Sequence, residues 1–318
     1  MTPDARPRPD ILSTMGRWGL GTGPLGNLFA AIDDDEARRI VDATWDRGVR
    51  MFDTAPHYGL GLAERRLGDA LRDRPRAEYV VSTKVGRLLV PNPEGASRRD
   101  SAGFDVPADL VRRWDFSARG VHESWERSLE RLGLDAVDIL YLHDPEDHLD
   151  AAVNEALPAL AELREAGHVS AIGIGTTNVA AAIAVVETGL VDVAMIAGRY
   201  TLLDRTAAER LLPAALDHDV AVVAAGVYNS GILATARPGP GSYYDYAPAP
   251  AEVIARAARL AEVCAAHGVE LPRAARAFAL RHPAVVSVVL GIGDPSFVPG
   301  TFDDDEPLPE ALWAELDA

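Results

Sequence analysis

The sequence predicts a single (β/α)8 barrel spanning residues 1–318. Short apolar, β-branched runs alternate with longer helical patterns, in eight successive units and without a linker-like break. Near-continuous apolar runs, such as VVSVVL at residues 285–290, are typical of parallel strands buried on both faces. This alternation and length favour a closed barrel. A doubly wound open sheet is the alternative, but no G-x-G-x-x-G fingerprint opens the first helix.

The first four units carry clear boundary signals. Asp33, Asp34 and Asp35 supply an N-cap and first-turn acids for the first helix, and Gly48 ends it. A long loop rich in Pro, Gly, Ser and Arg is expected at residues 87–116. The predicted strands are residues 18–23, 49–53, 79–84 and 137–143, and the helices are residues 33–47, 62–71, 117–132 and 151–166.

The second four units follow the same alternation. The predicted strands are residues 169–175, 191–197, 220–225 and 284–290, and the helices are residues 179–187, 207–217, 251–267 and 309–316. A second long loop is expected at residues 228–250. Both long loops follow strands, which is where a barrel enzyme keeps its active site.

Composition limits the classes of protein that this chain can be. The single cysteine, Cys264, lies in an apolar helical run, which predicts a buried, inert thiol rather than a disulfide framework. No apolar run approaches the ~20 residues that span a bilayer. The net charge of −17 argues against a nucleic-acid or anionic-membrane partner. We expect a cytoplasmic monomer or small homo-oligomer, with residues 1–12 as a flexible N-terminal tail.

Four ionisable side chains stand at successive strand ends. Asp53 ends the second strand, Tyr58 lies in the following turn, and Lys84 and His143 end the third and fourth strands. The C-terminal strand ends of a barrel ring one mouth, and neighbouring strands lie about 4.8 Å apart. We therefore expect these four side chains to converge.

Their chemistry favours proton transfer to or from an oxygen. A tyrosine hydroxyl has an ordinary pKa near 10. A nearby Lys84 ammonium is expected to lower the pKa of Tyr58, and Asp53 to hold that ammonium in place. His143 can orient the substrate oxygen, so the four groups suit a carbinol or carbonyl substrate.

Each of these residues also has an ordinary structural interpretation. Asp53 could cap a turn, Tyr58 could be a loop aromatic, Lys84 a strand-end charge and His143 a turn residue. Four such coincidences at successive strand ends are less credible than one site. A metal site is a further alternative, but the histidine and carboxylate lack additional ligands at useful spacing, so no metal is predicted.

Four segments resemble the aldo-keto reductase superfamily over nearly the whole chain. They are GLGTGPLGN (19–27), MFDTAPHYG (51–59), STKVGR (82–87) and DILYLHDPE (138–146). Asp53, Tyr58, Lys84 and His143 match the catalytic tetrad of that family position by position. The resemblance implies NAD(P)-dependent hydride transfer on a (β/α)8 barrel, without a Rossmann domain.

Three further segments are similar to the group that holds D-threo-aldose 1-dehydrogenase, L-fucose dehydrogenase and pyridoxal 4-dehydrogenase. They are AGRYTLLDR (197–205), GVYNSGILA (226–234) and GSYYDYAPAP (241–250). This likeness implies oxidation of the anomeric hydroxyl of an L-fucose-like aldose to a lactone, with Tyr58 as general acid and base. Reduction of a ketone or aldehyde in a biosynthetic pathway, and a nucleotide-sensing barrel without turnover, remain the alternatives.

The resemblance also implies a set of cofactor contacts. The family's Ser-Asn pair, Gln and stacking Tyr are replaced here by Gly175-Thr176, Ala197 and Ala225. Asn178 and Arg199 are the expected polar replacements. The full set of expected cofactor-binding residues is Gly21, Thr22, Asn178, Arg199, Gly226, Tyr228, Ser230, Gly231 and Gly291.

Two departures from the family are visible. Few residues precede Trp18, so the N-terminal hairpin that plugs the barrel floor is expected to be shortened. Residues 291–306 contain acids but no Arg or Lys to pair with a 2′-phosphate, which favours NAD over NADP, or weakened binding of the adenosine. Aromatic residues of the two long loops could stack on a sugar or pack the loops; they are Trp114, Tyr243, Tyr244 and Tyr246.

Overall fold

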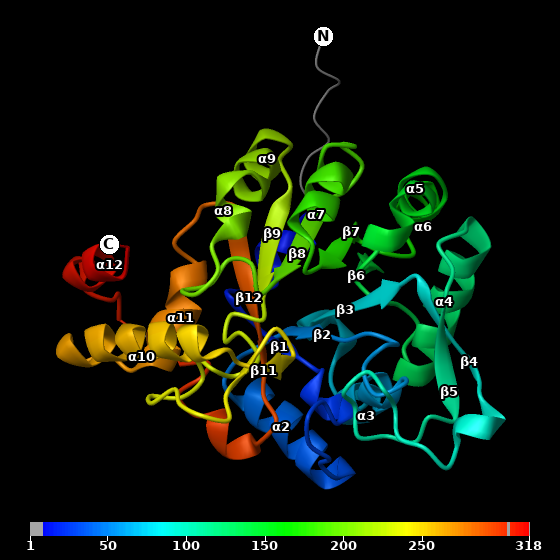
Figure 1. Cartoon of the computed structure of the whole chain (residues 1–318). Helices are drawn as coiled ribbons and strands as arrows, with labels where there is room; N and C mark the ends of the chain where they lie inside the picture. The colour runs from blue at the N-terminus through cyan, green and yellow to red at the C-terminus, as the bar shows by residue number, and fades with distance from the viewer. Residues whose placement is uncertain (1–8, 304–305, 318) are drawn as a thin grey trace.

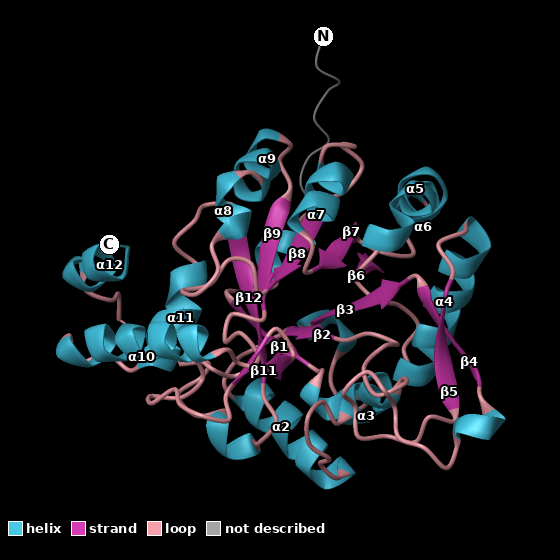
Figure 2. Cartoon of the chain, in the orientation of Figure 1, coloured by secondary structure: helices cyan, strands magenta, loops and turns pink. Residues whose placement is uncertain are grey.

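The computed structural model describes residues 9–303 and 306–317. Eight parallel strands close into a barrel in the order β1-β12-β9-β8-β7-β6-β3-β2, with the helices around the outside (Figure 2). The strands are β1 (Trp18–Gly21), β2 (Met51–Asp53), β3 (Val80–Val85), β6 (Ile139–His143), β7 (Ala171–Thr176), β8 (Val193–Ala197), β9 (Ala221–Ala225) and β12 (Val285–Gly291). The predicted (β/α)8 barrel is confirmed, and the open sheet is excluded.

The helices begin and end close to the predicted residues. Asp33 accepts a hydrogen bond from the Glu36 N–H, and Glu36 accepts one from the Asp33 N–H, which completes a capping box. Gly133 ends α4 in the left-handed conformation. The longer helices are α2 (Asp34–Asp46), α3 (Leu62–Leu71), α4 (Ala118–Leu132), α6 (Leu157–Glu165), α7 (Val179–Val186), α9 (Leu211–Asp217), α10 (Ala251–Ala266), α11 (Leu271–Ala279) and α12 (Glu310–Asp317).

Several elements differ from the prediction. Helix α11 was not expected; its Pro272 sits in the first turn, where proline fits. The buried residues of this helix include Phe278, Ala274, Ala275 and Ala279. The predicted helix 151–166 is α5 (Leu149–Ala151), a π-helical turn at Ala152–Ala156 and then α6. The predicted helix 207–217 is divided at Arg210 between α8 (Thr206–Glu209) and α9.

The two long loops are not structureless. The first contains an antiparallel pair, β4 (Arg87–Pro91) and β5 (Leu110–Trp114), which lies beside α4 (Figure 1). The second contains the short pair β10 (Tyr243–Tyr244) and β11 (Ala247–Pro248). Cross-strand hydrogen bonds therefore order segments whose Pro, Gly and Ser content suggested loops.

A short helix closes the floor of the barrel. Leu12 of α1 (Ile11–Thr14) and the adjacent Met15 are 3% and 1% exposed, and they pack against barrel-interior residues such as Met51 and Tyr141. Helix α1 and Met15 thus fill the floor of the barrel. The expected tail through residue 12 is too long, because Ile11 and Leu12 are helical; residues 1–8 lie outside the described residues.

Two carboxylates, one partly buried and one buried, tie neighbouring strands together at the floor end. Asp138, just before β6, accepts hydrogen bonds from the Val81 N–H and from Arg76, each at 2.7 Å. Asp192, just before β8, accepts hydrogen bonds from the Ile172 N–H at 2.9 Å and from Arg164 at 2.7 Å. These pairs stabilise the scaffold away from the mouth.

Two expectations about composition are also answered. Cys264 is a free thiol and is buried in α10, as predicted. Among the helices of the described residues, none is both long and apolar enough to cross a membrane.

Candidate active site

A cavity of about 750 Å³ opens at the C-terminal ends of the barrel strands. Small residues form much of its wall: Gly21, Gly175, Ala197, Ala225, Gly226 and Gly291. Three loop segments cover it, at residues 28–29, 101–104 and 245–246. A volume of this order is typical of small-molecule and cofactor sites.

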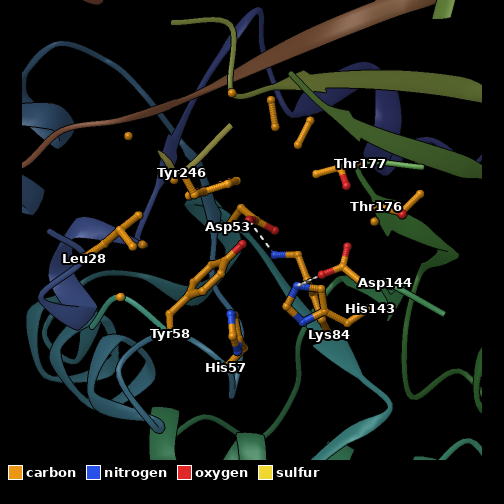
Figure 3. Close-up of a pocket in the computed structure, with 18 of the residues that line it drawn as sticks. Leu28, Asp53, His57, Tyr58, Lys84, His143, Asp144, Thr176, Thr177 and Tyr246 are labelled. Carbon is orange, nitrogen blue, oxygen red and sulfur yellow. Dashed lines mark hydrogen bonds and ion pairs between the residues drawn. The ribbon is translucent and has the colours of Figure 1, made fainter. Parts of the chain in front are cut away.

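The four ionisable residues at the strand ends line this one cavity (Figure 3). Lys84 Nζ donates hydrogen bonds to Asp53 Oδ2 at 2.7 Å and to the Thr54 carbonyl at 2.9 Å. The Lys84 and Asp53 side chains are only 2% and 3% exposed. Figure 3 shows the Tyr58 hydroxyl directed toward this ion pair, and Lys84 Nζ lies 4.8 Å from the centre of the Tyr58 ring.

Local backbone contacts fix the position of Tyr58. Gly59 has a φ of +61°, and a Cβ there would lie 2.3 Å from the carbonyl oxygen of Gly26. Gly26 ends the 3₁₀ turn η1 (Pro24–Gly26) that follows β1. Only a glycine allows this close backbone approach. The approach holds the turn that carries Tyr58 against the loop after β1.

Burial dominates the ionisation of the tyrosine. Burial raises the pKa of Tyr58 to about 12, although the nearby Lys84 acts to lower it. The expectation that Lys84 brings this pKa down is therefore wrong for the net effect, since desolvation of the phenolate is the larger influence. Burial also acts to lower the pKa of Lys84, but attraction to Asp53 and Tyr58 raises it to about 12. The lysine is thus an ammonium at neutral pH, and the tyrosine is a phenol.

Two neutral histidines flank the tyrosine. Burial, with the charges of Arg87 and Lys84, holds the pKa of His143 well below its ordinary value. His57, which the sequence analysis did not single out, lies with its ring centre 5.5 Å from that of His143. Burial and Arg87 lower the pKa of His57 to about 2. Both imidazoles can therefore act as neutral hydrogen-bonding groups toward a substrate oxygen.

One compositional signal for this site was available in the sequence. Lys84 is the only lysine in the chain; the other 30 basic residues are arginines. A lysine ammonium is a compact charge with three donors, whereas a guanidinium is a planar fork. A lysine in a chain that otherwise uses arginine marks a position where the compact ammonium is needed.

The structure places only some of the expected cofactor contacts in the cavity wall. Gly21, Arg199, Gly226 and Gly291 line it. The others lie outside the lining: Thr22 is fully buried, Asn178 caps α7, Ser230 accepts a hydrogen bond from the Tyr246 N–H, Tyr228 packs against the core and Gly231 is exposed.

Arg199 is held by its neighbours. Its guanidinium donates to the Thr177 carbonyl at 3.1 Å and to Asp245 at 2.9 Å, and it also pairs with Asp204 at 3.5 Å. Much of its donor capacity is therefore used within the protein.

The residues present fit a nicotinamide dinucleotide. Small residues at the ends of β7, β8, β9, β12 and β1 leave a broad surface on which a planar ring can lie. The segment after β12 forms a 3₁₀ turn, η6 (Pro295–Phe297), where the described residues hold no basic side chain. Two arginines reach this region but are engaged: Arg47 pairs with Asp303, and Arg273 donates to the Glu306 carbonyl.

The cavity lining includes residues that the sequence did not indicate, and only one of the four expected loop aromatics belongs to it. Asp144, Glu146 and Phe104 line the cavity, although no sequence signal had marked them. Tyr246 lines it too, whereas Tyr243 and Tyr244 do not. Trp114 packs against Phe116 and Arg87 outside the lining, so it orders the loop.

Comparisons with known proteins extend over nearly the whole chain. The model of the aldo/keto reductase family matches residues 15–304. D-threo-aldose 1-dehydrogenase of Pseudomonas sp is 48% identical over 305 residues, which cover 94% of this chain and 92% of that protein. Pyridoxal 4-dehydrogenase of Microbacterium luteolum is 37% identical, with coverage of 95% and 93%.

A solved structure agrees on the fold. The glycerol dehydrogenase of Gluconobacter oxydans superposes with a TM-score of 0.76 at 22% identity, covering 95% of this chain and 90% of that one. Taken with the family match and the two relatives, the chain is an NAD(P)-dependent oxidoreductase that belongs to the aldo/keto reductase family.

Proposed function

We propose that the protein is an aldose 1-dehydrogenase, which oxidises the anomeric hydroxyl of an unphosphorylated, L-fucose-like aldose to a lactone. The observation that carries the proposal is the cluster of Tyr58, Lys84, Asp53 and His143 in the wall of one cavity. The 48% identity to a D-threo-aldose 1-dehydrogenase supports the choice of substrate class.

In this proposal the anomeric hydroxyl lies between Tyr58 and His143. In its deprotonated form, Tyr58 takes the hydroxyl proton and becomes a phenol, and Lys84 stabilises the phenolate before the transfer. Asp53 holds the Lys84 ammonium through the 2.7 Å hydrogen bond. Neutral His143 fixes the substrate oxygen. A bound nicotinamide supplies the acceptor for the hydride that leaves the anomeric carbon, so loss of the proton and the hydride leaves the lactone carbonyl.

The charges of the cavity favour a neutral substrate. Among the described lining residues there are four carboxylates, Asp53, Asp144, Glu146 and Asp245, and two cations, Lys84 and Arg199. Both cations are already paired with a carboxylate. Arg87, outside the lining, pairs with Asp144, so three of the four carboxylates are matched by a cation. A phosphorylated sugar therefore finds no unengaged cation among the lining residues.

An aromatic cover suits a sugar ring. Tyr246 and Phe29 line the cavity from two different loops, with ring centres 6.2 Å apart. Phe104 lines it from a third loop. Aromatic faces bind the C–H face of a sugar while the carboxylates accept hydrogen bonds from its hydroxyls.

The decisive assay is a substrate panel. Purified protein is given NAD or NADP with a series of aldoses, and NADH or NADPH with pyridoxal and simple aldehydes, and the change in cofactor absorbance is followed. We expect aldoses to be oxidised and the lactone to be recovered. Cofactor binding without turnover across the panel would instead support a nucleotide-sensing barrel.

Reduction of an aldehyde or ketone is a second candidate. The pKa of Tyr58, at about 12, keeps the hydroxyl protonated at neutral pH, and a protonated tyrosine is the acid that reduction requires. Faster turnover of aldehydes than of aldoses, compared at saturating cofactor, would support this candidate.

We further propose that NAD is preferred over NADP. The described part of the segment after β12 has no basic side chain. Arg47, at the C-terminal end of α2, is already paired with Asp303. We expect NADH to bind at least about 10-fold more tightly than NADPH, as measured by fluorescence titration. Asp303→Ala frees Arg47 and should reduce the ratio of the two affinities. Asp46→Ala, which removes an acid next to Arg47 at the end of α2, should leave this ratio unchanged. Equal affinity of the wild type for both cofactors would contradict the proposal.

A further inference from the structure

Asp144 is an unusual residue at the cavity wall. It follows His143 at the end of β6, and its N–H donates to the Gly175 carbonyl at 3.0 Å, which continues the ladder to β7 by one residue. Its φ is +44°, a left-handed conformation that asparagine and aspartate tolerate better than other side chains. The backbone therefore turns at this residue, and the carboxylate lines the cavity beside His143 (Figure 3).

Two donors within the protein hold the carboxylate. Arg87 pairs with Asp144 Oδ2, and the Thr177 backbone N–H also donates to this carboxylate. The Arg87 side chain is only 11% exposed and lies 4.4 Å from the centre of the Trp114 ring. An ionised carboxylate has about four acceptor positions, so two donors leave further positions for a ligand in the cavity.

The spacing to the imidazole matches two oxygens on adjacent carbons. Asp144 Oδ2 lies 3.6 Å from His143 Nε2, and both groups line the cavity. A substrate oxygen bound by His143 therefore lies close to the acceptor positions of Asp144. The oxygen on the next carbon of a vicinal diol is near enough to the first to reach that carboxylate at the same time.

We propose that Asp144 determines specificity by accepting a hydrogen bond from the hydroxyl on the carbon next to the reacting carbon. The enzyme then recognises a vicinal pair of oxygens, which His143 and Asp144 bind together. This inference rests on the proposed oxidation of aldoses. It identifies the hydroxyl next to the anomeric carbon as the group that the site recognises.

The Arg87 ion pair selects the kind of donor. Because Arg87 neutralises the charge of Asp144, the pair as a whole gives a second cation no net attraction. A neutral hydroxyl donor gains a charge-assisted hydrogen bond without bringing a new charge into the cavity. The site is thus suited to a 2-hydroxy sugar in preference to a 2-amino sugar.

The first test uses the wild-type enzyme alone. We compare kcat/KM for an aldose that the enzyme oxidises with kcat/KM for its 2-deoxy counterpart. Loss of one charge-assisted hydrogen bond should lower kcat/KM by at least about 10-fold for the 2-deoxy sugar. Equal values for the two sugars overturn the proposal, whatever any variant does.

The second test uses Asp144→Asn, which keeps the size and suits the left-handed backbone. Its one oxygen faces Arg87 and Thr177, so the amide presents a donor to the cavity. We expect the ratio of kcat/KM for the aldose to kcat/KM for the 2-deoxy sugar to fall by about 10-fold, because only the aldose loses a hydrogen-bond partner. Equal losses for both sugars would show that Asp144 acts through His143, which overturns the proposal.

Asp138→Asn is the matched control. Asp138 lies just before β6, at the opposite end of the strand, and it also pairs with an arginine and accepts a backbone N–H. Loss of an aspartate–arginine pair away from the cavity should leave unchanged the ratio of kcat/KM for the aldose to kcat/KM for the 2-deoxy sugar. A shift in this variant equal to that of Asp144→Asn would overturn the assignment of the effect to the cavity.

Failure of the proposed function has a different signature. If the wild type oxidises no aldose, the same comparison is made in reduction, with lactaldehyde against propionaldehyde, which lacks the hydroxyl. Preference for lactaldehyde that disappears in Asp144→Asn sustains the role of Asp144 while refuting aldose oxidation. Equal reduction of the two aldehydes by the wild type refutes the role of Asp144 as well.

Discussion

The single hydroxyl of Tyr58 determines how the enzyme responds to pH. Because its pKa is raised to about 12, the base form needed for oxidation is scarce at neutral pH and increases as pH rises. The acid form needed for reduction is abundant over the same range. Neutral His143, whose pKa is well below its ordinary value, adds no titration there. We expect kcat/KM for oxidation to rise steadily between about pH 6 and pH 10, in steady-state rates at fixed ionic strength. A plateau already at neutral pH would contradict this assignment.

Removing the same hydroxyl tests its role directly. Tyr58→Phe keeps the ring but leaves no group to take or give the proton. We expect kcat to fall by roughly 10²–10⁴-fold, which is the usual contribution of a general acid or base. Cofactor affinity, measured by fluorescence titration, should stay within about 2-fold of the wild type, because the cofactor does not depend on this proton. Full activity in Tyr58→Phe would refute the proposed mechanism.

At the scale of a turn, Gly59 holds the loop that carries Tyr58. A methyl group at Gly59 would meet the Gly26 carbonyl at 2.3 Å, so Gly59→Ala must move the turn. Displacement of a positioned catalytic group by about 1 Å can cost roughly 100-fold in rate. We expect a loss of kcat of at least about 10-fold with an unchanged far-ultraviolet circular dichroism spectrum.

Gly133→Ala is the control for that variant. Gly133 has a similar φ of +63°, but a Cβ there meets nothing within 4 Å. Its replacement should cost roughly 1–2 kcal/mol of stability through backbone strain alone and should leave kcat unchanged. Equal kinetic losses in both variants would show that the Gly59 contact does not position Tyr58.

The short helix α1 stabilises the barrel from its floor. Met15 is 1% exposed and packs among interior side chains that include Met51 and Tyr141. Met15→Ala removes buried methylene groups and should lower the free energy of unfolding by about 2–5 kcal/mol in a denaturant titration. Because the floor is opposite the mouth, kcat of the folded enzyme should not change. An unaltered unfolding midpoint would contradict this role.

The element pattern could be predicted from the sequence wherever one residue type decides the outcome. Asp33 and Gly48 marked the ends of the first helix, and apolar runs marked the strands. Helix α11 was missed because Pro272, which fits the first turn of a helix, looks the same in sequence as a proline that prevents one. The pair β4 and β5 was missed because its order comes from hydrogen bonds between residues far apart in the chain.

At the scale of the whole molecule, the site could be predicted in position but not in electrostatics. Lys84 and His143 were placed at the mouth because a closed barrel brings all its strand ends to one rim. The net pKa of Tyr58 could not be predicted, because it depends on burial by loops from three parts of the chain. Asp144 and His57 escaped notice because their roles depend on cavity walls that appear only after closure.

The single lysine has one further consequence for the molecule as a whole. Lys84 is 2% exposed, so amine-acylating reagents do not reach this ammonium in the folded protein. Unfolding exposes Lys84 and adds one acylation site, which intact-mass spectrometry counts directly. The fraction of chains acylated at Lys84, followed against time in a dilute reagent, therefore measures how often the barrel opens. The residue proposed to stabilise the phenolate is, in this chain, also a built-in reporter of unfolding.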